Sequence, residues 1–147
     1  MLSTVVCREG GGGSMDWVIP GQLARSPRPG RSAAGDVQAD PVAVDTWLVR
    51  ARAHGIRSVI CLLSQEQLAL YGCLPQGLLT RYREEGFEVV HIDVEDAQWP
   101  PLQPAHVEQV WRAFVSLPKP VLVHCSAGLW RTGHAIEVIL GRLEQGG

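Results

Sequence analysis

Short apolar runs alternate along this chain with segments whose apolar residues follow helical spacing. The apolar runs are residues 56–63, 87–92 and 121–123, and each is too short for a typical helix. A short run that is apolar over most of its length is typical of a strand covered on both faces of a parallel sheet. Parallel strands need helical crossovers, and the segments between these runs have helical patterns. The sequence therefore predicts an α/β fold.

Four helices are predicted around these strands. Asp40 and Pro41 form a typical helix start, and Gly55 ends the helix that they begin. Further helices are predicted at residues 76–85, 107–117 and 135–143, and loops at residues 30–39 and 93–104. With one or two edge strands at residues 17–26, the prediction is a central, mostly parallel twisted sheet of about four to five strands flanked by helices.

The composition indicates one folded domain. The chain has 147 residues, of which 46% are hydrophobic and 19% are charged, and this balance excludes disorder over most of its length. Residues 10–14 are Gly-Gly-Gly-Gly-Ser. We therefore expect residues 1–14 to be a flexible N-terminal extension or linker and residues 15–147 to be the functional domain.

Charge and hydropathy disfavour several classes of partner. The net charge is −2 with acidic and basic residues intermixed, so we expect no nucleic acid and no membrane surface as a partner. No apolar run approaches the roughly 20 residues of a membrane-spanning helix, and the N-terminus lacks the charge of a secretion signal. We therefore expect a cytoplasmic protein. The four cysteines have no C-x-x-C spacing, which predicts neither a zinc site nor a disulfide framework.

The segment from His124 to Gly133 follows the last predicted strand and leads into the last predicted helix. A turn of this kind directs backbone N–H groups inward, and the helix N-terminus adds partial positive charge. Arg131 follows Cys125 after five intervening residues and can bind two oxygens of a tetrahedral anion with its planar guanidinium. The segment therefore predicts a phosphate-binding loop between the last parallel strand and a helix.

Cys125 lies at the base of this predicted loop. There the helix dipole, the N–H groups and a nearby guanidinium stabilise a thiolate relative to a thiol. A thiolate that attacks phosphorus gives a phosphocysteine intermediate and divides hydrolysis into two displacements. A second group must then protonate the leaving oxygen, and its ionised form can activate water in the second step.

Residues 124–133, His-Cys-Ser-Ala-Gly-Leu-Trp-Arg-Thr-Gly, resemble the signature loop of the cysteine-based protein tyrosine phosphatase superfamily. The short chain and residues 17–26 resemble its small atypical dual-specificity branch, so that the resemblance covers residues 15–143. It implies a thiolate nucleophile at Cys125, transition-state binding by Arg131 and assistance from Thr132 in breakdown of the phosphoenzyme. It further implies no metal or cofactor and a phosphate-binding loop made of Ser126, Ala127, Gly128, Leu129, Trp130 and Arg131.

The general acid of this family is an aspartate on a loop before the helix that leads to the signature strand. Residues 94–100 match this pattern best at Asp96. Asp93 and Glu95 lie in the same loop and remain the second and third candidates.

These features favour a phosphomonoester hydrolase that acts on phosphotyrosine in proteins or peptides, with phosphoserine and phosphothreonine as further substrates. The loop contains no lysine, which disfavours phosphoinositides with additional phosphates. One alternative is a pseudophosphatase, an interaction module that binds phosphate without turnover. Another is a sulfurtransferase or arsenate reductase, which would leave the Arg-Thr-Gly sequence and the upstream aspartate unexplained.

Several other residues have alternative interpretations. His124 either orients the loop by hydrogen bonding or is a structural histidine. Trp130 either stacks on an aromatic phosphoester or packs against Trp99. Cys61 is expected to be a buried spectator, with a redox partnership with Cys125 as the alternative. Arg28, like Arg25, either lines the pocket or is solvated, and arginines in turns are usually solvated.

Overall fold

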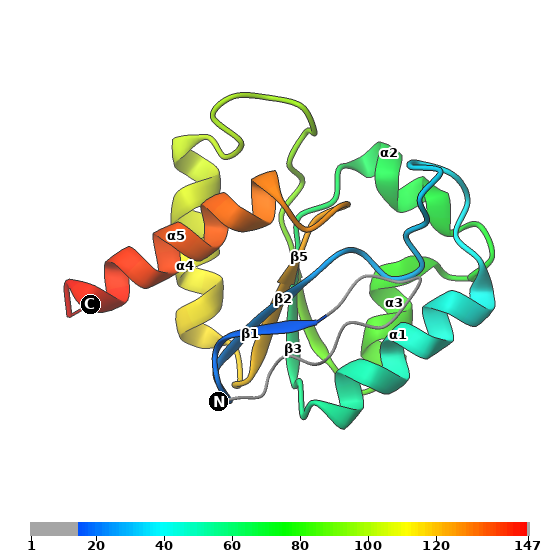
Figure 1. The fold of residues 1–147 in the computed structure, drawn as a ribbon, viewed down its shortest axis with the longest axis horizontal. Coiled ribbons are helices and arrows are strands. Elements are labelled where there is room, and N and C mark those ends of the chain that lie inside the picture. Colours follow the sequence, from blue (N-terminus) through cyan, green and yellow to red (C-terminus); the bar gives the residue numbers. More distant parts are fainter. Residues whose placement is uncertain (1–14, 147) are drawn as a thin grey trace.

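The computed structural model describes residues 15–146, and the predicted extension at residues 1–14 lies outside this part. Five strands form one sheet in the order β1-β2-β5-β3-β4 (Figure 1). The strands are β1 (Asp16–Ile19), β2 (Leu23–Ser26), β3 (Ser58–Cys61), β4 (Glu88–His91) and β5 (Val121–His124). β1 runs antiparallel to β2, and all other neighbouring strands are parallel. The predicted α/β fold with a mostly parallel sheet is confirmed.

Helices cover both faces of the sheet (Figure 1). One face carries α1 (Pro41–Ala53) and α3 (Gly77–Glu84), and the other carries α4 (Pro104–Ser116) and α5 (Trp130–Glu144). The start of α1 is as predicted, because the Asp40 carboxylate accepts a hydrogen bond from the Ala43 backbone. Among the described residues, no helix is long and apolar enough to cross a membrane.

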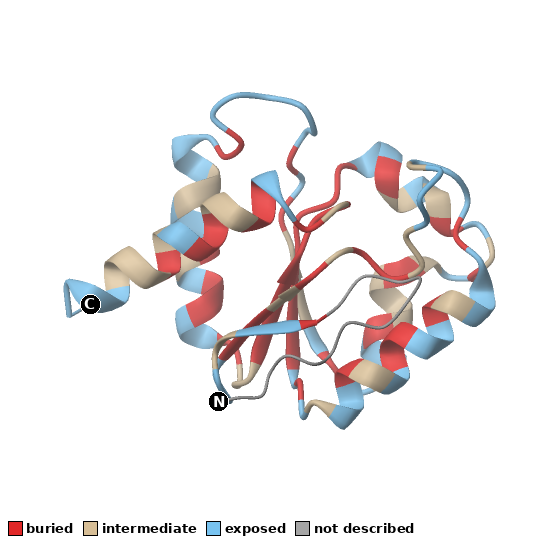
Figure 2. Cartoon of the chain, viewed as in Figure 1, coloured by how far each residue is buried: buried red, intermediate tan, exposed pale blue. Residues whose placement is uncertain are grey.

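Strand β3 contributes to both layers of the core, which explains why its sequence is apolar throughout. Val59 and Cys61 belong to the cluster formed with α1 and α3, whereas Ile60 and the following Leu62 belong to the cluster formed with α4 and α5. Successive side chains of a strand point to opposite faces, so a strand between two helical layers buries all of them. Figure 2 shows the central strands buried along their length.

A short helix that we do not predict from the sequence lies between β3 and α3. It consists of α2 (Gln65–Leu68), which continues into the 3-10 turn η2 (Ala69–Tyr71). Four residues are too few for hydrophobic periodicity to be visible. Instead, a capping box starts α2: the Ser64 hydroxyl accepts from the Gln67 backbone, and the Gln67 side chain accepts from the Ser64 backbone.

The four parallel strands end at the same edge of the sheet. Their last residues, Ser26, His124, Cys61 and His91, lie opposite one another in register. The segments that follow them therefore meet at this edge, and Figure 1 shows α2, the loop before α4 and the loop after β5 at the same end of the molecule. Ligands of open α/β sheets bind outside the carboxyl ends of the strands, so this edge is where a site is expected.

Candidate active site

The loop after β5 turns directly into α5. This helix begins at Trp130, earlier than the predicted start at residue 135, so that Arg131 and Thr132 lie in its first turn. Cys125 is the first residue of the loop and is 2% exposed. Within the described part of the chain, no backbone N–H of residues 126–132 donates a hydrogen bond to a protein acceptor. Consecutive N–H groups of this kind at a helix N-terminus can bind an anion such as phosphate.

Gly128 allows this loop to lie against the end of β2. Its φ is +79°, and a Cβ at this position would lie 2.9 Å from backbone atoms of Ser26. Hydrogen bonds join the loop to the β2 segment: Arg25 Nη2 donates to the Gly128 carbonyl at 2.8 Å, the Arg28 N–H donates to the Ser126 carbonyl at 2.9 Å, and Arg28 Nε donates to the Ser126 hydroxyl at 3.4 Å. Contacts with the β2 segment therefore hold one side of the loop in place.

His124 is fully buried directly before the loop. Its Nδ1 lies 3.0 Å from the Cys125 carbonyl oxygen, and its Nε2 lies 2.7 Å from the Tyr82 hydroxyl. Burial lowers the pKa of His124 to about 4, so the ring is neutral at neutral pH. A carbonyl can only accept, so Nδ1 carries the hydrogen and Nε2 accepts from Tyr82. Burial also raises the pKa of Tyr82, which keeps that donor protonated.

Arg131 is 2% exposed and reaches across the ends of β3 and β4. Its Nη1 donates to the carbonyl oxygens of Leu62 and Val94 and to Oε1 of Gln67, at 3.0, 2.9 and 2.9 Å. Its Nη2 lies 3.3 Å from Oδ2 of Asp96. One nitrogen of the guanidinium is therefore held by three acceptors, while another pairs with a carboxylate.

Among the three candidate acids, Asp96 is the one beside Arg131. Its side chain is half exposed, and Oδ2 also accepts a hydrogen bond from Gln67 Nε2 at 2.9 Å. Asp93 and Glu95 are exposed, and their carboxylates hydrogen-bond to no residue in the described part of the chain. The geometry therefore favours Asp96 over the two alternatives.

Thr132 is fully buried in the first turn of α5. Within residues 15–146, its Oγ1 is one of two buried side-chain polar atoms without a hydrogen-bond partner, the other being Nε of Arg31. Buried hydroxyl groups normally have partners, so an unpaired one next to a candidate site calls for an explanation.

The rim of the site is apolar and aromatic. Leu129, Trp130 and Trp99 are all exposed, and the rings of Trp99 and Trp130 meet edge to face with centroids 6.1 Å apart. Of the two roles considered for Trp130, packing against Trp99 is the one present in this structure. A cavity of about 280 Å³ is lined by this pair together with Asp96 and Arg131.

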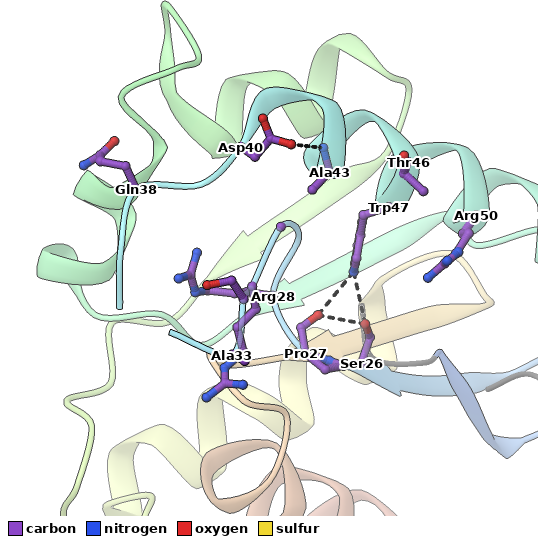
Figure 3. A pocket seen from close by; sticks show the side chains of 13 residues that line it. Ser26, Pro27, Arg28, Ala33, Gln38, Asp40, Ala43, Thr46, Trp47 and Arg50 are labelled. Carbon is purple, nitrogen blue, oxygen red and sulfur yellow. Dashed lines mark hydrogen bonds between the residues drawn. The ribbon is translucent and has the colours of Figure 1, made fainter. Parts of the chain in front are cut away.

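A larger cavity, of about 560 Å³, lies on the α1 side of β2 (Figure 3). The segment from Ser26 to Asp40 and one side of α1 line it, whereas residues 125–132 do not. At its base, the Trp47 indole N–H donates to the Ser26 hydroxyl at 3.0 Å and to the Pro27 carbonyl at 3.2 Å. This cavity is therefore separate from Cys125 despite its greater volume.

Three residues around the loop have contacts that the sequence does not predict. Arg28 is 1% exposed rather than solvated, because its guanidinium lies against the Tyr71 ring and donates to the Tyr71 hydroxyl and the Ser126 hydroxyl. Asp36 accepts from the Ser126 hydroxyl at 3.3 Å, and Gln67 contacts both Arg131 and the loop carboxylates. The capping-box pattern at the start of α2 is a sequence signal that could have located Gln67.

Cys61, the last residue of β3, is fully buried. Burial raises the pKa of Cys61 to about 12, so Cys61 remains a thiol at neutral pH. Among residues 15–146, no group of three or more His, Cys, Asp or Glu side chains could hold a metal ion.

Residues 41–145 match the family described as polymorphic toxin system, DSP-PTPase phosphatase. No curated protein sequence is significantly similar to the chain.

Several solved structures share the fold. A kinase-associated phosphatase with serine in place of its catalytic cysteine has a TM-score of 0.64 and 21% identity over 82% of this chain and 65% of that chain. A DUF442 protein from Shewanella putrefaciens CN-32 has a TM-score of 0.60 and 19% identity over 92% and 75%. The core catalytic domain of the PP-IP phosphatase SIW14 from S. cerevisiae has a TM-score of 0.55 and 20% identity over 83% and 61%. The chain thus spans less than two thirds of the first and third of these proteins.

Proposed function

We propose that this chain, which belongs to the family of DSP-PTPase phosphatases of polymorphic toxin systems, hydrolyses phosphomonoesters through a phosphocysteine intermediate on Cys125. The family and the fold make it a cysteine-based phosphatase. The substrates that we propose are phosphorylated proteins or peptides, with phosphotyrosine first and phosphoserine and phosphothreonine as further candidates.

The observation that carries this proposal is the arrangement of the loop after β5. Cys125 stands at its start, the N–H groups of residues 126–132 have no protein acceptor within the described chain, and Arg131 lies in the first turn of α5. Backbone N–H groups without protein acceptors and a guanidinium in the same loop-to-helix turn suit the oxygens of a phosphoryl group.

In the first step, the Cys125 thiolate attacks phosphorus, and the bond between phosphorus and the ester oxygen breaks. Asp96 in its protonated form gives its proton to the leaving oxygen, so that an alcohol or phenol departs. Arg131 and the loop N–H groups stabilise the charge on the transferred phosphoryl oxygens. The position of Asp96 beside Arg131 supports this assignment.

In the second step, water attacks the phosphorus of the phosphocysteine, and Asp96 as a carboxylate takes the proton of that water. The bond between sulfur and phosphorus breaks and returns the thiolate and inorganic phosphate. The unpaired buried hydroxyl of Thr132 supports a role for this residue in stabilising the departing thiolate.

The aromatic rim supports phosphotyrosine as the first candidate substrate. The walls of the cavity beside Arg131 include the rings of Trp99 and Trp130, which offer a phenyl ring apolar and aromatic contacts.

Hydrolysis of phenyl phosphate in the presence of a metal chelator tests the proposal, with the wild type compared with Cys125→Ser. We expect turnover in the wild type and none in the variant, because a serine hydroxyl at this place is not ionised. Tungstate, an oxyanion similar to phosphate in shape, should bind to both proteins. A folded, reduced wild type that binds tungstate without any turnover would instead identify the pseudophosphatase alternative.

A further inference from the structure

The Gln67 side chain hydrogen-bonds to residues from three separate segments of the site. It lies on α2 and is 4% exposed, and all of its side-chain polar atoms are engaged. Its Oε1 accepts from Arg131 Nη1 at 2.9 Å. Its Nε2 donates to Oδ2 of Asp96 at 2.9 Å and to Oδ2 of Asp36 at 3.1 Å.

The two carboxylates belong to loops that follow different strands. Asp36 lies in the segment between β2 and α1, and Asp96 lies in the segment between β4 and α4. Asp36 also accepts from the Ser126 hydroxyl of the phosphate-binding loop at 3.3 Å. The Gln67 side chain therefore links Arg131 of α5 to the loop that contains Asp36 and to the loop that contains Asp96.

The chemistry of an amide suits this position. The oxygen faces a cation and the nitrogen faces two anions, so each end of the side chain meets the partner that it can bind. A carboxylate in place of the amide could still accept from Arg131. It could donate to neither aspartate and would place a third negative charge beside them.

We propose that Gln67 is a positioning residue that holds Arg131 and Asp96 in a fixed relation to each other. It also holds Asp36 next to Ser126 of the phosphate-binding loop. This inference rests on the proposed function, since it assigns Gln67 to the same reaction. Gln67 acts on that reaction through two other side chains. One replacement of Gln67 should therefore affect only proton transfer by Asp96, whereas another should affect both proton transfer by Asp96 and oxyanion binding by Arg131.

Two replacements of Gln67 separate these effects. Gln67→Glu keeps an acceptor for Arg131 and for the Ser64 N–H and loses both donations, whereas Gln67→Met has a similar length and loses all four hydrogen bonds, including the one from the Ser64 backbone. Gln65 is exposed on the same helix, so Gln65→Glu and Gln65→Met are matched controls. Phenyl phosphate, with a poor leaving group, depends on the general acid, and 2,4-dinitrophenyl phosphate, with a good one, depends on it little.

For Gln67→Glu, we expect kcat/KM to fall about tenfold or more for phenyl phosphate and by less than about threefold for 2,4-dinitrophenyl phosphate. The alkaline limb of the phenyl phosphate pH profile, which reports the acid, should shift as well. For Gln67→Met, both substrates should lose activity, and tungstate should raise the melting temperature less than in the wild type. The Gln65 variants should match the wild type in every measurement.

The Asp96→Asn background provides a second check that is independent of folding. If Gln67 acts through Asp96, Gln67→Glu should cause no further selective loss for phenyl phosphate in that background, because coupled residues are not additive. Equal losses for both substrates in Gln67→Glu, with an unchanged pH profile, would overturn the proposal. Activities of the Gln67 variants within about twofold of the Gln65 variants would do so too.

The tungstate measurement separates failure of this inference from failure of the proposed function. If the wild type has no turnover, the proposed function fails, but a tungstate response that is reduced in Gln67→Met and retained in Gln65→Met still supports the positioning of Arg131. If the wild type turns over and the tungstate responses of all variants are equal, the positioning of Arg131 by Gln67 is wrong.

Discussion

The guanidinium of Arg131 and the carboxylate of Asp96 form an ion pair, with Nη2 3.3 Å from Oδ2. The group assigned to phosphate binding and the group assigned to protonating the leaving oxygen thus bind each other. A phosphoryl dianion at the loop would compete with Asp96 for Arg131. The pair therefore links phosphate binding by Arg131 to the position of the Asp96 carboxylate.

Asp96→Asn should separate binding from turnover. Hydrolysis of phenyl phosphate should slow by about 10²-fold or more, because the proton donor is lost. Tungstate should bind about threefold or more tightly, because the competing charge beside Arg131 is removed. Steady-state kinetics and calorimetric titration with tungstate measure the two effects.

Asp93→Asn is the matched control for this prediction, since Asp93 lies in the same loop and hydrogen-bonds to no described residue. It should retain wild-type turnover and tungstate affinity. The assignment of the acid is wrong if Asp93→Asn loses turnover and Asp96→Asn does not.

The strands and the signature loop could be predicted because their signals are local. The apolar run at residues 121–123 and the ten residues after it specify a strand, a turn and a helix start without reference to the rest of the chain. The start of α5 is an exception. The helix begins at Trp130 rather than at the predicted residue 135, and the Gly133 N–H bonds to the Leu129 carbonyl at 2.7 Å inside its first turn.

The partners of Arg131 could not be predicted in the same way. Leu62, Gln67 and Val94 lie 69, 64 and 37 positions away in the sequence, and the order of the strands brings them together. The burial of Arg28 has the same origin, because its contacts with Tyr71 and Ser126 depend on how loops from different strands pack at the sheet edge. Local propensity contains no information on such contacts.

Gly128→Ala should damage the loop more than its backbone angle alone would. A Cβ at Gly128 meets the backbone of Ser26 at 2.9 Å, whereas Gly21 has a similar φ of +73° and no atom within 4 Å of a Cβ. We expect Gly21→Ala to lower the free energy of unfolding by about 1 kcal/mol and Gly128→Ala by about 3 kcal/mol. Urea denaturation measures both, and tungstate binding should be lost only in Gly128→Ala.

The Trp99 and Trp130 pair should help to hold the loop that bears Asp96. Trp99 lies three residues after Asp96, and its ring meets Trp130 at the start of α5. We expect Trp99→Ala and Trp130→Ala to lower kcat for phenyl phosphate by similar factors. The kcat of the double variant should lie within about twofold of the kcat of either single variant. Trp17→Ala, in β1 and distant from this loop in the sheet order, is the control. Fully additive losses would indicate that each ring contacts the substrate independently.

His124 should make the stability of the fold depend on pH in the weakly acidic range. In the folded state, burial lowers its pKa to about 4, whereas a solvated histidine has a pKa of 6.5. As the pH falls through 6.5, the unfolded chain therefore takes up a proton while the folded chain does not, and the free energy of unfolding decreases. This loss continues until the pH reaches the folded-state pKa.

From pH 7.5 to pH 5, the contribution of this residue to the decrease should be about 2 kcal/mol. Urea denaturation at both pH values measures it. In His124→Asn, whose amide has one acceptor and a donor as the neutral imidazole does, the decrease should be smaller by that amount, even if the variant is less stable at both pH values. His54→Asn, at the end of α1, should retain the wild-type decrease. An equal decrease in His124→Asn and the wild type would mean that His124 takes up its proton over the same pH range in the folded and unfolded states, and burial would then not lower its pKa.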